Sequence, residues 1–335
     1  MMMDQLKVYN ITNHRGWTGQ ILNYGATLNA LFISDAKGIQ RSVVLGFENP
    51  MVYGSAVHQN AQFFVGATVG RFAGRIGSGG FRLNDQDHPI SANERGIQLH
   101  GGPQALNTLY WTAPANHSPS DASIELSVLS PEGHNGFPGN LKITARFEWL
   151  DETFRVTYTA CSDQDTIVNL TNHSYFNLDG SGSVCGHELY INANKRLALN
   201  DDLLPTGHYC SLVGTSFDFS KSKPICQKSF GGLDTPFVLK KRGPHAILYS
   251  QKSGIKLSVT TNQPGLVVFT PHNFSHLTQE FMTPHEPWPG LCLECQNFPD
   301  APHHPHFPTS VLKANEVYNH ITDYDFSIDG FGQKG

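Results

Sequence analysis

Apolar and polar residues alternate along much of this chain of 335 residues. In a β-strand, successive side chains point to opposite faces, so strict alternation indicates a strand with one buried and one solvated face. The pattern predicts antiparallel strands within residues 123–128, 141–149, 154–160 and 255–259, where every second residue is apolar. No stretch of a dozen residues carries the 3.6-residue apolar period of an amphipathic helix.

Turn-forming residues separate the predicted strands at short intervals. Clusters of Gly, Pro, Asn, Asp or Ser occur at residues 48–50, 131–133, 179–182 and 263–265. Many short strands joined by such turns are typical of a large sandwich or barrel. All-β sandwiches can be long, and no linker-like or low-complexity segment divides this chain. We therefore expect an all-β protein, a large antiparallel β-sandwich, with residues 1–335 forming a single domain.

Charge and cysteine content indicate which binding partners and which cellular compartment to expect. The formal net charge is −5 and 15% of the residues are charged, so we expect no binding to nucleic acid or to an anionic membrane. Six cysteines without disulfide-framework spacing indicate free thiols in a reducing compartment. Residues 1–8 lack the basic and apolar regions of a signal peptide, and no apolar run reaches membrane-spanning length. A cytoplasmic protein is expected.

A short apolar stretch near the C-terminus carries one acidic residue. Residues 290–301 read Gly-Leu-Cys-Leu-Glu-Cys-Gln-Asn-Phe-Pro-Asp-Ala and predict a strand that ends at Pro299. On that strand Glu294 shares a face with Cys292 and Gln296. Removal from water raises the pKa of a carboxyl toward neutrality, which suits a general base. For Glu294 alone, an exposed position or a structural ion pair is the alternative.

A glycine-rich stretch, residues 66–77, contains Arg71 and Arg75. It lacks the Gly-Lys-Ser/Thr ending of a phosphate loop, and no helical pattern follows it. Glycines let the backbone come close to a small ligand, and the fork of an arginine can donate hydrogen bonds to hydroxyl groups. A structural role that ties loops together is the alternative for either arginine alone.

Two histidines and one aspartate lie in further polar motifs. His100 precedes two glycines, although a lone histidine is more often structural than catalytic. In residues 169–178, the pattern places His173 on a polar strand face that must be hydrogen-bonded or face a cleft. Asp234 follows a Gly-Gly-Leu loop and precedes a predicted strand, where turn capping is the alternative.

Two clusters of potential metal ligands do not predict a metal site. Cys292 and Cys295 have no second Cys-x-x-Cys pair, and on a strand their thiols would point to opposite faces. The histidines within residues 303–306 could bind a transition metal, but the prolines around them favour a surface loop. We therefore expect no metal.

Taken in chain order, these motifs closely resemble those of the aldose 1-epimerase (galactose mutarotase) family. The resemblance spans roughly residues 24–320, and the matching segments are residues 70–76, 99–102, 129–139, 171–178, 204–207, 232–234 and 293–300. It implies a galactose mutarotase-like supersandwich with an open sugar-binding cleft. It also implies a small-molecule aldose substrate and no metal or organic cofactor.

The same resemblance assigns roles to individual residues. Glu294 matches the general base of the family and His173 its general acid. His100 matches a second histidine beside the reacting centre and is counted with the substrate-binding residues. Arg75 and Asp234 match residues that contact sugar hydroxyls.

Arg71 matches the first arginine of the glycine-rich motif and is also counted with the substrate-binding residues, in a supporting role. Three departures from the family concern sugar contacts. Gly74 stands where members often carry Asn, and residues 103–107 replace a common Gly-Phe-Asp-Lys run. Val267 stands where members often have Gln, and we expect Val267 to face the sugar rather than the core.

Anomer interconversion requires one base and one acid. The C1 hydroxyl loses its proton while the ring oxygen gains one, which opens the ring, and rotation about the C1–C2 bond precedes closure. We expect Glu294 to be the desolvated base, and His173, held protonated by nearby carboxylates, to be the acid. In a bell-shaped pH profile, Glu294 would give the acidic limb and His173 the alkaline limb.

Three other functions stay open at this stage. A glycoside hydrolase would pair Asp234 with Glu294 about the scissile bond, but would leave the histidine motifs unexplained. A non-catalytic sugar-binding sandwich would need no acid–base pair. A hexose-6-phosphate 1-epimerase would share the fold and the pair, and would also need cationic contacts for the phosphate.

Overall fold

The computed structural model describes residues 5–113, 118, 121–277 and 279–329. The first four residues of the N-terminal stretch considered above lie outside this part of the chain. The described helical elements are at most six residues long, in agreement with the absence of a helical period. They are η1 (Pro50–Gly54), α2 (Ala56–Ala61), η2 (Leu106–Thr108), η3 (His134–Gly136), η4 (Val184–Gly186), η5 (Ser275–Leu277) and η6 (Ala301–His303). None of them is long and apolar enough to cross a membrane.

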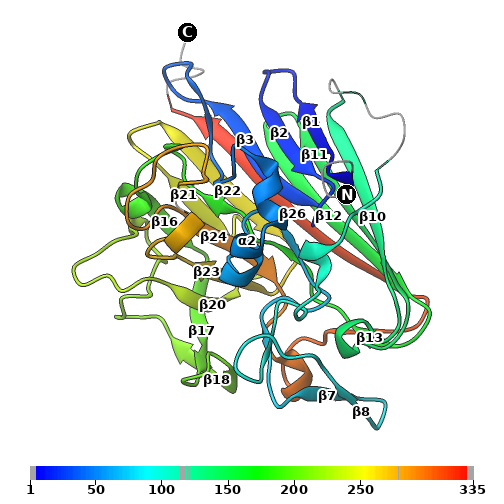
Figure 1. Ribbon diagram of the computed structural model, residues 1–335. Coiled ribbons are helices and arrows are strands. Elements are labelled where there is room, and N and C mark those ends of the chain that lie inside the picture. Colours follow the sequence, from blue (N-terminus) through cyan, green and yellow to red (C-terminus); the bar gives the residue numbers. More distant parts are fainter. Residues whose placement is uncertain (1–4, 114–117, 119–120, 278, 330–335) are drawn as a thin grey trace.

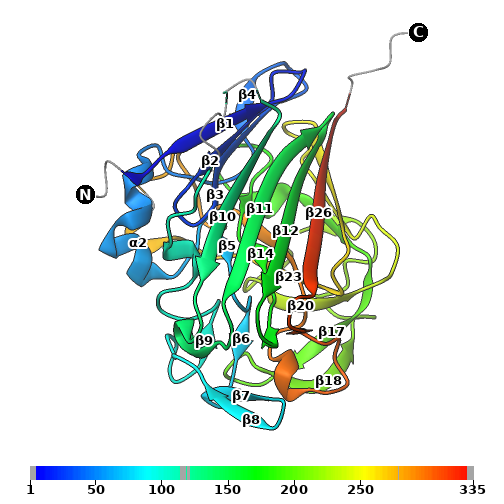
Figure 2. The same cartoon turned by 90° about the vertical axis from the view of Figure 1, so that its right-hand side faces the viewer.

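The largest sheet has eight strands, and all of its pairings are antiparallel. Figure 2 shows four of its long strands, β10, β11, β12 and β26, side by side. In spatial order, its strands are β10 (Ser123–Ser130), β11 (Leu141–Leu150), β12 (Thr153–Ser162), β26 (Val317–Ile328), β22 (Ile255–Thr261), β21 (Ala246–Tyr249), β16 (Glu188–Ile191) and β19 (Lys223–Pro224). The four strands predicted from strict alternation are β10, β11, β12 and β22, so that prediction is confirmed.

A second antiparallel sheet has six strands, and Glu294 lies on one of them, β24. Figure 1 labels β24, β23, β20, β17 and β18 of this sheet. Its order is β15 (Tyr175–Phe176), β24 (Leu291–Gln296), β23 (Gly265–Phe269), β20 (Asp234–Leu239), β17 (Ala193–Leu199) and β18 (Pro205–Ser211). The strand predicted around Glu294 is therefore β24, and it ends before Pro299 as expected.

Smaller antiparallel sheets complete the fold. One has four strands in chain order, β1 (Val8–Thr12), β2 (Thr18–Leu22), β3 (Thr27–Ser34) and β4 (Gln40–Ser42). Four are pairs, β5 (Thr68–Val69) with β14 (Thr171–Asn172), β6 (Arg75–Ile76) with β9 (Gln98–Leu99), β7 (Gly80–Leu83) with β8 (Gln86–Pro89), and β13 (Thr166–Ile167) with β25 (Val311–Leu312).

The main hydrophobic core joins the eight-stranded sheet to the six-stranded sheet. Phe147 and Val259 of the larger sheet belong to the same buried cluster as Leu266 and Leu293 of the smaller one. Each of these side chains is at most 1% exposed, and burial of apolar surface is the dominant favourable contribution to folding. The alternation along the strands thus produces two packed sheets, and the predicted large antiparallel β-sandwich is confirmed.

The segment around His173 differs from its prediction as one strand. It forms two short strands, β14 and β15, which pair with different partners, β5 and β24. Between them Ser174 donates from its backbone N–H and its hydroxyl to Asn172 Oδ1, at 3.2 and 2.5 Å. A side-chain acceptor that captures the next backbone N–H competes with a strand ladder. His173 therefore lies at a turn between two strands.

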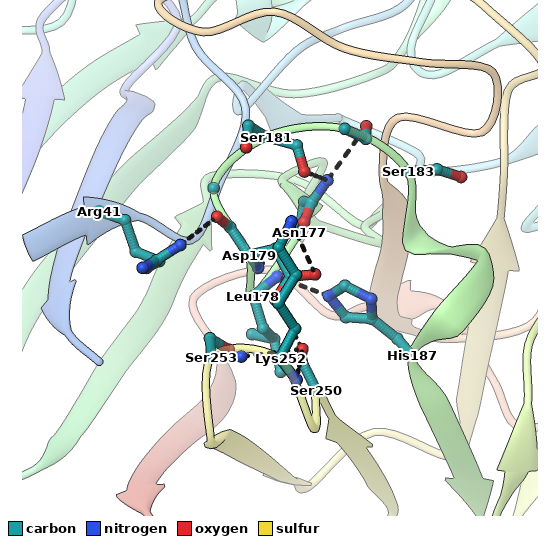
Figure 3. A network of polar contacts seen from close by, with 12 residues as sticks. Arg41, Asn177, Leu178, Asp179, Ser181, Ser183, His187, Ser250, Lys252 and Ser253 are labelled. Carbon is teal, nitrogen blue, oxygen red and sulfur yellow. Dashed lines mark hydrogen bonds and ion pairs between the residues drawn. The ribbon is translucent and has the colours of Figure 1, made fainter. Parts of the chain in front are cut away.

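A buried polar network fixes the turn that follows β15 (Figure 3). Asp179 accepts a hydrogen bond from the Ser250 hydroxyl at 2.6 Å, and its backbone carbonyl accepts from Arg41 at 2.7 Å. The backbone N–H of Leu178 donates to His187 Nε2 at 3.0 Å. Burial lowers the pKa of His187 to about 4, against the raising effect of Asp179. The ring is therefore neutral at pH 7 and can accept that bond.

The cysteines differ from the expectation of free thiols. A disulfide joins Cys185 to Cys226, while Cys161, Cys210, Cys292 and Cys295 are free. The two bonded cysteines are 41 residues apart in sequence, and only the fold brings their Cα atoms to 4.6 Å. The expectation of free thiols is wrong for this pair because sequence spacing alone does not reveal it.

Candidate active site

A cavity of about 260 Å³ opens on the face of the six-stranded sheet opposite the core. Along one face of β24, Leu291, Leu293 and Cys295 belong to the core. On the opposite face, Glu294 and Gln296 line the cavity. The full lining is Ala61, Gln62, Gly74, Arg75, Glu94, Leu99, His100, His173, Tyr175, Leu199, Leu203, Asp234, Pro236, Val267, Phe269, Glu294, Gln296 and Pro299. Five of the six site residues predicted from the sequence are therefore brought together.

Glu294 lies in the wall of this cavity. Its side chain is 2% exposed, and its Oε2 atom has no hydrogen-bond partner among the described residues. Burial raises the pKa of Glu294 well above its ordinary value; Asp234 raises it further, while Arg75 lowers it. The direction agrees with the raised pKa expected from the sequence, because a carboxylate removed from water is destabilised relative to the neutral acid.

His173 lies beside Glu294, with its Nε2 atom 3.5 Å from Glu294 Oε1. Its Nδ1 atom lies 3.3 Å from the thiol of Cys292. Two backbone hydrogen bonds fix the residue, one from its N–H to the Ala67 carbonyl at 2.9 Å and one from the Gly66 N–H to its own carbonyl at 3.0 Å. The strand β14, the strand β24 and the glycine-rich stretch together determine where the imidazole lies.

The protonation state of His173 differs from expectation. Burial lowers the pKa of His173 to about 4, so its imidazole is neutral at pH 7 in the free protein. We expected nearby carboxylates to hold it protonated. That expectation is wrong for the free protein because the carboxyl beside it, Glu294, is driven toward its own neutral form by the same burial. Burial thus favours the neutral form of both groups, in which the one proton of the pair is on Glu294.

His100 faces the same cavity with a defined tautomer. The backbone N–H of Gly74 donates to His100 Nδ1 at 3.2 Å. Burial, followed by His173 and Arg75, lowers the pKa of His100 well below its ordinary value. Because Nδ1 of the neutral ring accepts a hydrogen bond, Nε2 must carry the proton. His100 is consequently a neutral hydrogen-bond donor, and its ring packs edge-on against that of His173 with centroids 5.2 Å apart.

Arg75 and Asp234 form the charged side of the cavity together with Glu94. Arg75 donates from Nε and Nη2 to the two carboxylate oxygens of Glu94, at 2.6 and 3.2 Å, and its Nη1 lies 3.8 Å from Asp234 Oδ2. Burial raises the pKa of Asp234; Arg75 opposes that shift, and Glu94 adds to it. This guanidinium is held in place by Glu94, with its third nitrogen directed toward Asp234.

Among the residues described, one group could hold a metal ion. One potential ligand atom from each of His100, His173 and Glu294 lies within 4.8 Å of the other two. Histidine ligands of metals usually donate their second ring N–H to an acceptor. Here Nδ1 of His100 faces the N–H donor of Gly74 instead, which is the reverse of that pattern. The absence of a metal role stays a prediction, and the hydrogen bonding supports it.

The other histidine cluster serves the fold. His303 Nδ1 contacts Asp300 Oδ1 at 2.7 Å. His304 and His306 place Nε2 at 2.9 and 2.8 Å from the carbonyl oxygens of Pro205 and Gly207 in β18. His304 Nε2 also lies 3.6 Å from Asp300 Oδ2, so the three side chains contact groups of the protein itself, in agreement with the loop predicted there. Likewise, Cys292 and Cys295 lie on opposite faces of β24, as expected.

Comparison with known proteins identifies the family. The family model described as aldose 1-epimerase matches residues 7–325. Galactose mutarotase from Sus scrofa is 37% identical over 319 residues, which cover 92% of this chain and 90% of that protein. Aldose 1-epimerase from Escherichia coli K12 is 31% identical over 336 residues, covering 96% of this chain and 95% of that protein.

The chain belongs to the aldose 1-epimerase family.

Solved structures agree with this assignment. An aldose epimerase homologue from C. elegans superposes with a TM-score of 0.87 at 30% identity, over 96% of this chain and 99% of that one. Galactose 1-epimerase from Lactobacillus acidophilus gives a TM-score of 0.82 at 29% identity, over 95% and 93% of the two chains. As a member of the family, the protein is an isomerase, and its fold is the galactose mutarotase-like sandwich that the sequence motifs imply.

Several cavity residues of this aldose 1-epimerase family member were missed from the sequence. Glu94 and Gln62 lie in irregular segments without a periodic pattern or a motif, so no local signal distinguishes them. Tyr175 and Phe269 lie on short strands, and only the fold turns them toward the cavity. Val267 lines the cavity opposite Glu294 in the β23–β24 ladder, which confirms that it faces the site rather than the core.

Arg71 is the one predicted substrate-binding residue that does not line the cavity. It is 2% exposed, and its guanidinium donates to the hydroxyl and carbonyl of Ser130 and to the carbonyls of Pro131, Pro138 and Gly139 at 2.7–2.9 Å. Burial lowers the pKa of Arg71 to about 10, which leaves it charged at pH 7. The assignment to substrate binding is wrong because the guanidinium donors are bonded to these protein groups. This is the structural role that was the alternative in the sequence analysis.

The variant Arg71→Lys should therefore lose stability rather than substrate affinity. A lysine cannot reproduce the fork and would leave several buried carbonyls unpaired, so the free energy of unfolding should fall by roughly 3 kcal/mol. Urea denaturation measures this loss, and KM of the folded variant should change less than about twofold. Arg82→Lys, at a side chain that is 62% exposed, is the matched control. A stable variant with a raised KM would contradict the structural role.

The pKa values of the Glu294–His173 pair predict the pH dependence of catalysis. Below the pKa of His173, at about 4, both groups are protonated and no base is left. Above the raised pKa of Glu294, both are deprotonated and no acid is left. The plot of kcat/KM against pH should thus show an acidic limb from His173 and an alkaline limb from Glu294, the reverse of the sequence-based assignment. An alkaline limb that persists unchanged in Glu294→Gln would contradict this assignment.

Proposed function

We propose that this protein interconverts the α and β anomers of unphosphorylated aldohexoses such as galactose and glucose. The observation that carries the proposal is the buried Glu294–His173 pair at the wall of a cavity, in which Glu294 Oε1 lies 3.5 Å from His173 Nε2. Ring opening requires one group that takes a proton and one that gives a proton. A pair with one proton meets this requirement without a cofactor.

The reaction begins with movement of the shared proton. Transfer from Glu294 Oε1 to His173 Nε2 produces a carboxylate and an imidazolium without any change in the total charge of the pair. The carboxylate then takes the proton of the C1 hydroxyl while the imidazolium protonates the ring oxygen, and the bond between C1 and that oxygen breaks. The open-chain aldehyde rotates about its C1–C2 bond. Ring closure on the other carbonyl face returns both protons, so the two groups exchange roles.

The predicted residues that line the cavity beside the pair, His100, Asp234 and Arg75, hold the sugar. In its neutral tautomer, His100 carries its proton on Nε2, so it can donate a hydrogen bond to the sugar beside the reacting pair. Asp234 offers an acceptor whose side chain is 33% exposed, toward the cavity, and Arg75 offers its Nη1 donors. Neutral hydroxyl groups both donate and accept, so alternating donors and acceptors fit a polyol.

The cavity favours a neutral sugar over a sugar phosphate. Arg75 is the one cationic side chain among the described residues that line it, and its Nε and Nη2 atoms are already bonded to Glu94. Phosphate recognition normally uses free cationic donors, often the bidentate fork of an arginine. The glycoside hydrolase alternative is also disfavoured, because it leaves the buried His100 and His173 without a role, and a mere sugar-binding module needs no acid–base pair.

We also propose that the chain is one domain and that it works in the cytoplasm. The family match over residues 7–325 and a core that includes both Ile11 and Phe326 support one domain. Four free cysteines support a reducing compartment, whereas the Cys185–Cys226 disulfide is the feature that opposes it. Alkylation of thiols in intact cells, read by mass spectrometry, tests the location: labelling of both Cys185 and Cys226 supports the cytoplasm.

Polarimetry of freshly dissolved sugars tests the proposed substrate class. The enzyme should accelerate the change in optical rotation of α-galactose or α-glucose above the spontaneous rate, in the presence of a strong chelator as well as without it. With glucose 6-phosphate, kcat/KM should be at least about tenfold lower, since no free cation meets the phosphate. A preference for the phosphorylated sugar would overturn the proposed substrate. Loss of activity to the chelator that zinc restores would overturn metal independence.

Removal of the carboxyl group tests the catalytic pair. Glu294→Gln keeps the shape of the side chain but leaves the pair without a carboxylate, so kcat should fall on the order of 10²–10⁴-fold with little change in KM. The same polarimetric assay measures both constants. Wild-type kcat in this variant would remove Glu294 from the mechanism and leave His173 and His100 as the groups to examine.

A further inference from the structure

Gln296 is a buried cavity residue that the mechanism does not use. It lies two positions after Glu294 on the same face of β24, lines the cavity, and is 1% exposed. Its Oε1 atom is buried and has no hydrogen-bond partner among the described residues. A buried acceptor without a partner is costly, and the great majority of such groups in proteins are satisfied. A buried acceptor without a partner, in a residue that lines a binding cavity, is therefore a candidate ligand contact.

The orientation of the amide is fixed by its neighbours. Nε2 of Gln296 donates to the carbonyl oxygen of Asn297 at 3.3 Å. Because a carbonyl can only accept, the nitrogen end of the amide must face it, which leaves Oε1 as the free atom. Gly74 makes room for this arrangement: a Cβ there would lie 3.3 Å from Gln296 Nε2 and 2.9 Å from Pro299.

The adjacent strand supplies no polar group at the neighbouring positions. In the β23–β24 ladder, Gly265 pairs with Gln296 and Val267 pairs with Glu294. Val267 and Phe269 line the cavity with apolar side chains. On this part of the wall, Gln296 thus presents the acceptor next to the carboxyl of Glu294.

We propose that Gln296 is a specificity-determining substrate contact, which accepts a hydrogen bond from one hydroxyl group of the aldose. The inference rests on the proposed function, because the ligand is taken to be the sugar on which the Glu294–His173 pair acts. A neutral hydroxyl supplies the proton that Oε1 lacks. A sugar that has no hydroxyl at that place, or an ionised phosphate there, leaves the buried acceptor unpaired.

The experiment compares glucose with 2-, 3-, 4- and 6-deoxyglucose in the wild-type enzyme and in Gln296→Met. Each of these monodeoxy sugars lacks one hydroxyl but keeps the C1 hydroxyl and the ring oxygen that the reaction needs. For glucose, the variant should raise KM roughly three- to tenfold, the usual effect of one hydrogen bond. Its kcat should stay within about twofold, because ground state and transition state lose the contact alike. For one monodeoxy sugar the wild type and the variant should have equal kcat/KM, while for the others the difference persists.

A structural role predicts a different result. If Gln296 only supports the strand, kcat/KM of the variant should fall by the same factor with every sugar, or should not fall at all. Either result would refute the proposed contact. The melting temperature of Gln296→Met should be unchanged or higher, because the substitution removes an unpaired buried acceptor, and the Asn297 carbonyl keeps a donor in Asn169. Gln296→Leu repeats the comparison if the methionine variant does not fold.

Gln98→Met is the matched control. Gln98 is also buried, at 2% exposure, and its Oε1 also has no partner among the described residues, but it does not line the cavity. The ratio of kcat/KM in Gln98→Met to kcat/KM in the wild type should be the same for glucose and for every monodeoxy sugar. The proposed function itself fails if the wild-type enzyme does not accelerate anomer interconversion of unphosphorylated aldohexoses, or if it prefers the phosphorylated sugar. The failure of the inference is thus distinct from the failure of the function.

Discussion

The structure depends on the burial of one strand on both of its faces. On one face of β24, Leu291, Leu293 and Cys295 pack into the core that joins the two large sheets. On the other face, Glu294 is held at the cavity without bulk water around it. The packing that stabilises the sandwich is thus also what desolvates the carboxyl. The same strand therefore contributes both to the stability of the sandwich and to the raised pKa of Glu294.

Desolvation then determines the chemistry of the group beside it. A buried ion pair between Glu294 and His173 would carry two charges out of water, which is unfavourable unless many hydrogen bonds compensate for it. The neutral arrangement, with the proton on the carboxyl, avoids that cost in the free protein. The two arrangements differ only in the position of one proton. A polar ligand in the cavity therefore needs only to shift the equilibrium between the neutral pair and the ion pair, without supplying or removing a charge.

Much of the fold was predictable from the sequence, and the reason is physical. Strands such as β11 and β12 have one face in the core and one toward solvent, so apolar and polar residues alternate along them and predict the strands directly. The motif resemblance located Glu294, His173, His100, Arg75 and Asp234. The sequence could not show that the segment around His173 divides between two sheets, because a side-chain hydrogen bond at Asn172 competes there with the strand. Nor could it show that Arg71 points away from the cavity, since the buried hydrogen bonds of its guanidinium leave no mark on local hydrophobic periodicity.

The ion pair between Arg75 and Glu94 has a consequence for how the enzyme meets its substrate. Arg75 and Glu94 offset each other's charge at the cavity, and burial raises the pKa values of Asp234 and Glu294. Salt ions screen long-range fields, and a neutral sugar has no charge on which such a field could act. Encounter between enzyme and substrate is then governed by unaided diffusion and by the shape of the opening. For a neutral sugar, we therefore expect the rate of encounter to depend little on ionic strength.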